Sequence, residues 1–177
     1  TTAGAASTTV AITAGQSSVL FCVAGGSGEA GATSSLTASA TGFGSGTRTV
    51  SVLQPVVGLS SIATNLTTQS ADSGFSVLVG IGQPATPTVL STLQEARKGG
   101  GGVTVTVSVP DTSVVQLKSG AQTGASVTVP IAERSSQNTA TVSIDGLAPG
   151  TTSLTTSLPG GVASSSGSFP GSQSVTV

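Results

Sequence analysis

The chain has no histidine, tryptophan, tyrosine or methionine, and its only cysteine is Cys22. Without histidine it lacks the side chain that most often serves as a general acid or base in enzymes. A single cysteine excludes an internal disulfide bond. Four phenylalanines are the only aromatic residues, which leaves few faces for stacking on sugar rings or nucleic-acid bases. These absences argue against an enzyme and against a binder of carbohydrate or nucleic acid.

Charge is also scarce. Charged residues make up 6% of the 177 residues and leave a formal net charge of −1, whereas about 25% is usual. So weak a field attracts neither nucleic acid nor an anionic membrane. A surface poor in lysine and glutamate but rich in serine and threonine indicates an extracellular or cell-surface protein. We see no signal peptide at Thr1 and no apolar run of about 18 residues that would insert into a membrane. We therefore expect any export or anchoring signal to lie outside these residues.

The sequence does contain short runs in which apolar and polar residues alternate, each closed by Gly, Pro, Asn or Ser. This period of two is typical of half-buried β-strands. The runs are Thr8–Ile12, Val19–Val23, Leu36–Ala40, Arg48–Leu53, Phe75–Ile81, Val103–Val109, Val114–Leu117, Ser126–Ile131, Thr139–Ile144, Ser153–Ser157 and Ser172–Val177. Only Thr88–Lys98 fits a helical turn, which the glycines of Gly99–Gly102 would end. The pattern predicts an all-β chain built of antiparallel β-sandwiches.

An internal repeat organises these runs. The segment Ser126–Gly146 repeats the pattern of Ser7–Gly25, with an alternating strand, a polar turn and a second alternating strand. Pro159–Val177 then repeats Ala40–Val52. The loops differ in length between the two copies, while the strand patterns correspond.

The repeat divides the chain into two units of unequal completeness. Residues 53–177 hold one whole unit, whereas residues 1–52 hold only the second half of another. We expect this half to be completed by missing residues of the polypeptide or by a neighbouring chain, because half a sandwich exposes unpaired strand edges. The partners we expect are therefore adjacent repeats or copies of the chain itself. Strand donation between them would build a filament.

The repeated segments resemble bacterial immunoglobulin-like (Big-type) repeat domains of large secreted or cell-surface proteins. The resemblance lies in Gly101–Leu117 and Ala125–Gly160, and in Thr8–Gly25 and Leu36–Val52 of the first unit. It implies tandem immunoglobulin-like antiparallel β-sandwiches, the first one incomplete, that serve as a spacer, stalk or filament subunit. The buried tryptophan and paired cysteines of antibody domains are absent, so the chain does not belong to the antibody branch of immunoglobulin-like domains. The second unit is long, and we expect Asn65–Lys98 to add an edge strand or a surface excursion.

Few residues are candidates for chemistry. A Ser–Lys pair would need Lys98 or Lys118 to be desolvated beside a hydroxyl, but both lie in Gly- and Ser-rich segments that indicate exposed turns. Cys22 sits in an alternating run and is expected to pack as a small apolar residue. The acidic residues are scattered singly, without the spacing of a calcium loop: Glu29, Asp72, Glu95, Asp111, Glu133 and Asp145. We therefore expect no catalytic, cofactor-binding or metal-binding residue and no cofactor.

Three positions are expected to be polar turns. Asp111 and Asp145 are typical turn residues, and Glu133–Arg134 is predicted to be the solvated tip between two strands. The triplet Asn65–Thr67 matches the acceptor motif for N-glycosylation. Its use is left open.

The phenylalanines divide into two pairs. Phe21 and Phe75 occupy strand positions and are expected in a core. Phe43 and Phe169 occupy equivalent loops of the two units. Each is expected to anchor its loop to its own sandwich, with insertion into a neighbouring molecule as the alternative.

These observations favour a structural module of an extracellular or cell-surface repeat protein or filament, such as a stalk, sheath or fibre subunit. One alternative is an adhesin or ligand-binding module, for which an exposed aromatic or acidic cluster would be evidence. Another is an immunoglobulin-like decoration component of a phage virion, for which a self-sufficient domain would be evidence. We do not expect an enzyme.

Overall fold

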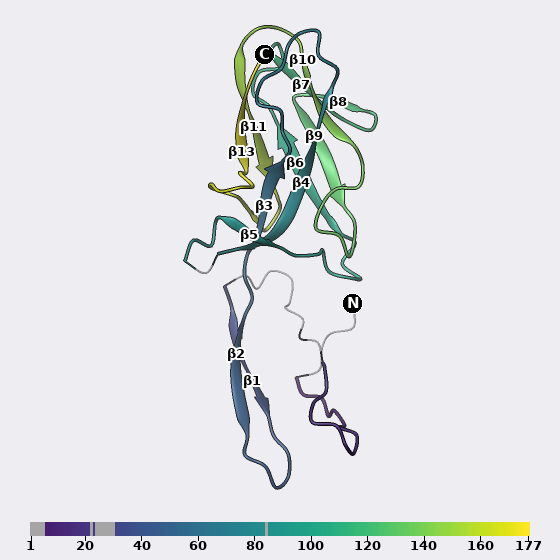
Figure 1. Cartoon of the computed structure of the whole chain (residues 1–177), viewed down its shortest axis with the longest axis vertical. Helices are drawn as coiled ribbons and strands as arrows, with labels where there is room; N and C mark the ends of the chain where they lie inside the picture. The colour runs from purple at the N-terminus through teal and green to yellow at the C-terminus, as the bar shows by residue number, and fades with distance from the viewer. Residues whose placement is uncertain (1–5, 22, 24–30, 84) are drawn as a thin grey trace. The chain divides into compact units, whose positions relative to one another are not determined.

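The structure is a computed structural model, and it describes residues 6–21, 23, 31–83 and 85–177 (Figure 1). By the proximity of its backbone the chain divides into two units, Thr1–Val52 and Leu53–Val177, here called unit 1 and unit 2. All regular elements within the described ranges are strands, and none is a helix. The prediction of an all-β chain is therefore confirmed.

The larger sheet of unit 2 has seven strands. Its hydrogen-bonded order is β12 (Val162–Ala163), β3 (Pro55–Ser60), β4 (Ser73–Gly82), β10 (Val142–Gly146), β7 (Val115–Ser119) and β8 (Gln122–Gly124), with β5 (Leu90–Leu93) paired to β4. Neighbouring strands are antiparallel except β12 and β3, which are parallel.

The smaller sheet has four antiparallel strands. Its order is β13 (Ser172–Thr176), β11 (Thr151–Ser157), β6 (Val103–Ser108) and β9 (Ser126–Ile131). Strands β7 and β10 belong to one sheet, while β6, β9 and β11 belong to the other. The chain therefore crosses repeatedly between the two sheets.

The inner faces of the two sheets share one core. The larger sheet contributes Val57, Leu59, Phe75, Val77, Val79, Val115, Leu117, Val142 and Ile144, and the smaller sheet contributes Val105, Val107, Val127, Val129, Ile131, Leu154 and Val175. Alternate residues of a strand point to the same face, which explains why the period-two runs supply this core. Burying each such side chain contributes about 1.5–3 kcal/mol. Two sheets packed over a common core form a β-sandwich.

Strands β3 and β4 are also buried on their outer faces. There a small second cluster joins Val56, Leu78 and Leu90, with Val162 and Phe169 packed against it. A strand covered on both faces reads as a continuous apolar run. For this reason the segment PVVGLS that forms β3 has no alternation, and its pattern did not predict a strand.

Most of the strands predicted for unit 2 are present. The runs at Phe75, Val103, Val114, Ser126, Ser153 and Ser172 correspond to β4, β6, β7, β9, β11 and β13, and the run at Thr139 is shifted to β10. The helical turn predicted in Thr88–Lys98 was wrong. Strand β5 occupies this segment, because Leu90 packs on the outer face of the sheet while β5 pairs with β4. It is the edge strand expected within Asn65–Lys98.

The part of unit 1 that the structure describes contains one antiparallel hairpin, β1 (Thr33–Ala38) and β2 (Gly46–Ser51). The described residues of the runs Thr8–Ile12 and Val19–Val23 are not in strands, so the prediction of four strands in this unit was wrong. A strand is held by hydrogen bonds to a neighbouring strand. In the described part of unit 1, only β1 and β2 have such a partner.

Candidate functional site

The hairpin of unit 1 and the hairpin β11–β13 of unit 2 have the same register. In unit 1, Thr33 lies opposite Ser51 and Leu36 lies opposite Arg48. When Leu36 is aligned with Leu154, as in LTASATG and LTTSLPG, and Ser51 with Thr176, the aligned residues pair in the same way in unit 2: Thr151 with Thr176, and Leu154 with Gln173. Under this alignment each unit has an antiparallel hairpin at the end of the repeat, with the same residues opposite each other.

Burial differs sharply between matched residues of the first repeated strand. The repeat matches Val10 and Ile12 with Val129 and Ile131 of β9. Val129 and Ile131 are 0% and 1% exposed, whereas Val10 and Ile12 are 44% and 55% exposed. The same side chains that close the core of unit 2 thus face solvent in unit 1.

The second repeated strand shows the same difference. Phe21 and Val23 match Val142 and Ile144 of β10, and they are 47% and 54% exposed instead of buried. The expectation that Phe21 lies in a core was wrong, because no opposing sheet covers it among the described residues of unit 1. We call Val10, Ile12, Phe21 and Val23 the exposed apolar set of unit 1, and Leu36 and Val50 of the hairpin are half-buried. The described residues of unit 1 thus leave uncovered the apolar side chains whose counterparts unit 2 buries.

Phe43 and Phe169 behave differently although their loops are equivalent. Phe169 packs on the outer cluster of β3 and β4, as expected of a loop anchor. Phe43 is 80% exposed, so the same expectation was wrong for unit 1. Phe75 lies in the core of unit 2 as predicted.

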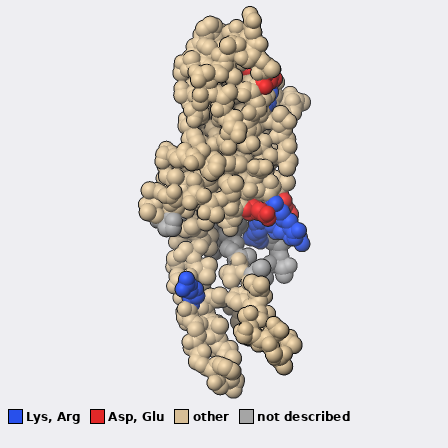
Figure 2. Space-filling model, in the orientation of Figure 1, with Lys and Arg blue, Asp and Glu red and all other residues tan. Residues whose placement is uncertain are grey.

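Charged side chains are few, and Figure 2 shows them in small groups on a face that is otherwise uncharged. One group joins Lys118 of β7 to Asp72 and Asp145, with Nζ to carboxylate distances of 3.0 and 2.9 Å. The hydrogen bonds that Lys118 donates to Asp145 and Asp72 raise the pKa of Lys118 above its usual value. A lysine held protonated in this way is neither a nucleophile nor a base. The Lys118 ammonium is engaged by two carboxylates and not by the serine hydroxyl that a Ser–Lys pair would need.

The group corrects two expectations. Lys118 and Asp145 lie within strands β7 and β10, on the outer face of the sheet, and not in turns. The acidic residues are not all isolated either, since cross-strand pairing brings Asp72 and Asp145 to one ammonium. Lys118 and Asp145 each follow an inward-facing residue of an alternating strand, which is the sequence signal that would place them on a shared outer face.

A second group surrounds the glycine loop that precedes β6. The Glu133 carboxylate accepts a hydrogen bond of 2.7 Å from the backbone N–H of Gly101. Hydrogen bonds from the N–H groups of Gly99 and Gly101, with smaller effects of Lys98 and Arg134, lower the pKa of Glu133. Glu133 is exposed, as predicted, but it also holds this loop in place.

The remaining candidates have local roles. Asp111 accepts hydrogen bonds from the backbone N–H and the hydroxyl of Ser113, at 2.9 and 2.6 Å, which lower the pKa of its carboxyl group. Its expected turn is thereby confirmed. Asn65 of the glycosylation motif is exposed. Cys22 and Glu29 lie outside the described residues.

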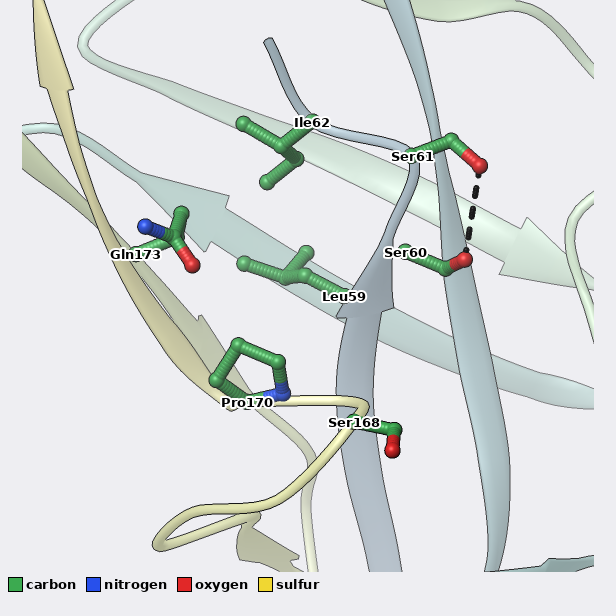
Figure 3. Close-up of a pocket in the computed structure, with 7 residues that line it drawn as sticks. All are labelled: Leu59, Ser60, Ser61, Ile62, Ser168, Pro170 and Gln173. Atoms are coloured by element: carbon green, nitrogen blue, oxygen red, sulfur yellow. Dashed lines mark hydrogen bonds between the residues drawn. The ribbon is translucent and has the colours of Figure 1, made fainter. Parts of the chain in front are cut away.

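Two shallow hollows of about 140 Å³ each lie on unit 2. Figure 3 shows the first, which is lined by Leu59, Ser60, Ser61, Ile62, Ser168, Pro170 and Gln173. The Ser60 and Ser61 hydroxyls are 3.4 Å apart. The second is lined by Leu53, Gln54, Gly82, Gln83, Pro87, Thr88 and Val162. Neither lining contains a titratable side chain, so neither hollow can activate a serine as a nucleophile.

The described residues contain no group of three or more acidic, cysteine or histidine side chains placed to hold a metal ion. Within the same ranges no helix is long and apolar enough to cross a membrane. Comparison with protein-family models, curated proteins and solved structures finds no match to this chain.

Proposed function

We propose that the chain is a structural module of an extracellular or cell-surface repeat protein or filament, such as a stalk, sheath or fibre subunit, and that it is not an enzyme. The observation that carries the proposal is the common register of β1–β2 and β11–β13. Tandem copies of one supersecondary unit are the usual way to build an elongated protein from small repeated cores.

The strand order of unit 2 supports an immunoglobulin-like topology. Labelled along the chain as A to G, strands β3, β4, β6, β7, β10, β11 and β13 give one sheet in the order A-B-E-D and another in the order C-F-G. These are the two sheets of a constant-type immunoglobulin domain. Strand β9 is an additional strand that pairs with the outer edge of β6.

The surface of unit 2 supports a passive role. Lys118, Glu133 and Asp111 are each engaged in structural contacts. Its two hollows are lined by neutral side chains. Serine and threonine dominate the outward positions of the strands, a chemistry that suits a secreted protein with little net charge.

The proposal is tested on the protein from its natural source, with antibodies raised against residues 53–177. We expect the antibodies to label intact, unpermeabilised cells or secreted fibres. On a denaturing gel they should detect a polypeptide much heavier than 16.7 kDa. Labelling that requires permeabilisation of the cells would overturn the extracellular assignment. A polypeptide of 16.7 kDa would overturn the repeat protein and leave a filament subunit as the only form of the proposal.

A further inference from the structure

We propose that the exposed apolar set of unit 1 is covered by the first half of another repeat, a polypeptide segment with the strand pattern of Leu53–Gly124. The proposal rests on the proposed function, because both interpret the chain as repeats, and it adds the identity of the partner. In unit 2 the residues that match this set close a core whose other side comes from the first half of the same repeat.

The contacts within unit 2 specify what the partner must offer. Strand β9 pairs only with β6, and β10 pairs with β4 and β7. The hairpin β11–β13 also joins its sheet through β6. Every partner of these second-half strands outside the hairpin lies in Leu53–Gly124. A segment that orders unit 1 must therefore provide equivalents of β4, β6 and β7.

Strand exchange among copies of Thr1–Val177 cannot cover every unit 1, because each copy has fewer first halves of the repeat than second halves. Each copy contains two second halves, Ser7–Val52 and Ser126–Val177, but only one first half, Leu53–Gly124. That first half already packs against the second half of unit 2, because Leu154 and Val129 of this second half are both 0% exposed. An exchange that covered unit 1 would uncover the second half of some unit 2. Any number of copies thus leaves one uncovered second half per copy.

Pairing two copies of unit 1 face to face is also insufficient. In unit 2 the second-half strands β9 and β10 do not pair with each other, and only β11 and β13 do. Two second halves placed together would therefore bring no strand equivalent to β4 or β6. The partner is then a first half that is additional to the one in this chain.

The experiment appends a second copy of residues 53–124 before Thr1 of the full chain and measures amide hydrogen exchange across Thr8–Val52. We expect exchange there to slow by at least about a thousand-fold relative to the unmodified chain, as in a folded domain. Intrinsic fluorescence is not usable without Trp or Tyr, so exchange is followed by NMR or mass spectrometry. Sedimentation of both proteins reports their oligomeric state.

Two matched pairs of variants make the result specific. Val105→Asp in the appended copy only should abolish the added protection, because it disrupts the strand expected beside unit 1, while Thr104→Asp there should not. In unit 1, Val10→Asp should abolish it and Thr9→Asp should preserve it, since Thr9 matches the outward-facing Thr128. Unit 2 of each protein serves as the internal reference for folding.

Three results would overturn the proposal. Thr8–Val52 could exchange as fast in the extended protein as in the unmodified chain. It could be protected in the unmodified chain as a monomer, so that unit 1 completes itself. It could be protected there only in a dimer, so that a second copy is the occupant. None of these outcomes changes the cell-surface labelling that tests the proposed function, so the two proposals fail separately.

Discussion

Leu36 and Leu154 occupy the same position in two hairpins of identical register, yet Leu154 is fully buried and Leu36 is partly exposed. The local sequence therefore determines the hairpin, because strand pattern and register are the same in both. Burial depends on the sheet that lies opposite. In unit 2 that sheet is formed by residues distant in the chain, such as Val57 and Leu117.

The first prediction compares these two leucines. Leu154→Ala should destabilise unit 2 by about 2–5 kcal/mol, because it removes buried methyl groups and leaves a cavity in the core. Leu36→Ala should change the unfolding free energy of unit 2 by no more than about 0.5 kcal/mol. Urea unfolding followed by circular dichroism measures both. Equal losses in the two variants would contradict the assignment of the core to unit 2 alone.

The second prediction concerns the close approach of a loop to β3. A Cβ placed on Gly58 would lie 2.3 Å from the carbonyl oxygen of Phe169, which is a backbone atom and cannot rotate away. Gly58→Ala should therefore displace the loop and destabilise unit 2 by about 1–3 kcal/mol. Gly74→Ala in the adjacent strand is the control, because the nearest atom to its Cβ, the carbonyl oxygen of Val142, would be 3.8 Å away.

The control substitution should be neutral or slightly stabilising, by about 0.4–1 kcal/mol, since alanine reduces the freedom of the unfolded chain. Thermal unfolding of both variants measures the difference. If Gly58→Ala were as stable as Gly74→Ala, the loop would have to move without cost, and Phe169 would not be an anchor.

The strands that could be predicted from the sequence are those with one face in the core and one in solvent. Strands β6 and β9 alternate valine with threonine or another outward residue, and both were found. Strand β3 could not be found by alternation because the cluster around Val56 covers its outer face. The run at Thr8 has the right alternation, but a strand also requires a partner, and periodicity carries no information about one.

The contacts of the charged side chains could be predicted from the sequence even less than the strands. Asp72, Lys118 and Asp145 lie far apart in the sequence, and only the pairing of β10 with β4 and β7 brings them together. Glu133 was correctly placed at an exposed tip, but its bond to Gly101 depends on the register of β6 with β9. Such contacts follow from tertiary pairing, whereas the turn at Asp111 is local and was predicted.

The third prediction concerns acid. The pKa of Glu133 is lower in the folded protein than its ordinary value of 4.5. The stabilisation from its hydrogen bonds is therefore complete above pH 4.5 and is lost as the pH falls through the folded pKa. In Glu133→Gln the hydrogen exchange of the Gly101 amide should become faster at neutral pH. The protection of this amide should also change less than in the wild type when the pH is lowered below 4.5. Glu95→Gln is the control, and an equal acceleration of Gly101 in that variant would contradict a role specific to Glu133.

The last prediction concerns the Lys118 group. Its two carboxylates contact a single Nζ, so Lys118→Met would leave Asp72 and Asp145 facing each other without a counter-ion. We expect the variant to unfold at a lower temperature than the wild type at low ionic strength. The deficit should shrink in 1 M salt, where charges are screened within about 3 Å. Lys118→Met combined with Asp72→Asn should recover part of the loss.

The pH dependence distinguishes this ion group from lost packing of the lysine stem. The pKa of Lys118 is raised above its ordinary value of 10.5, so its stabilising effect is present below pH 10.5 and disappears as the pH rises through the folded pKa. The wild type and Lys118→Met should therefore converge in stability only above pH 10.5. Lys98→Met, which removes the same charge from a loop, should show no such convergence. A deficit in Lys118→Met that is independent of both salt and pH would contradict a role of the Lys118 charge in the stability of unit 2.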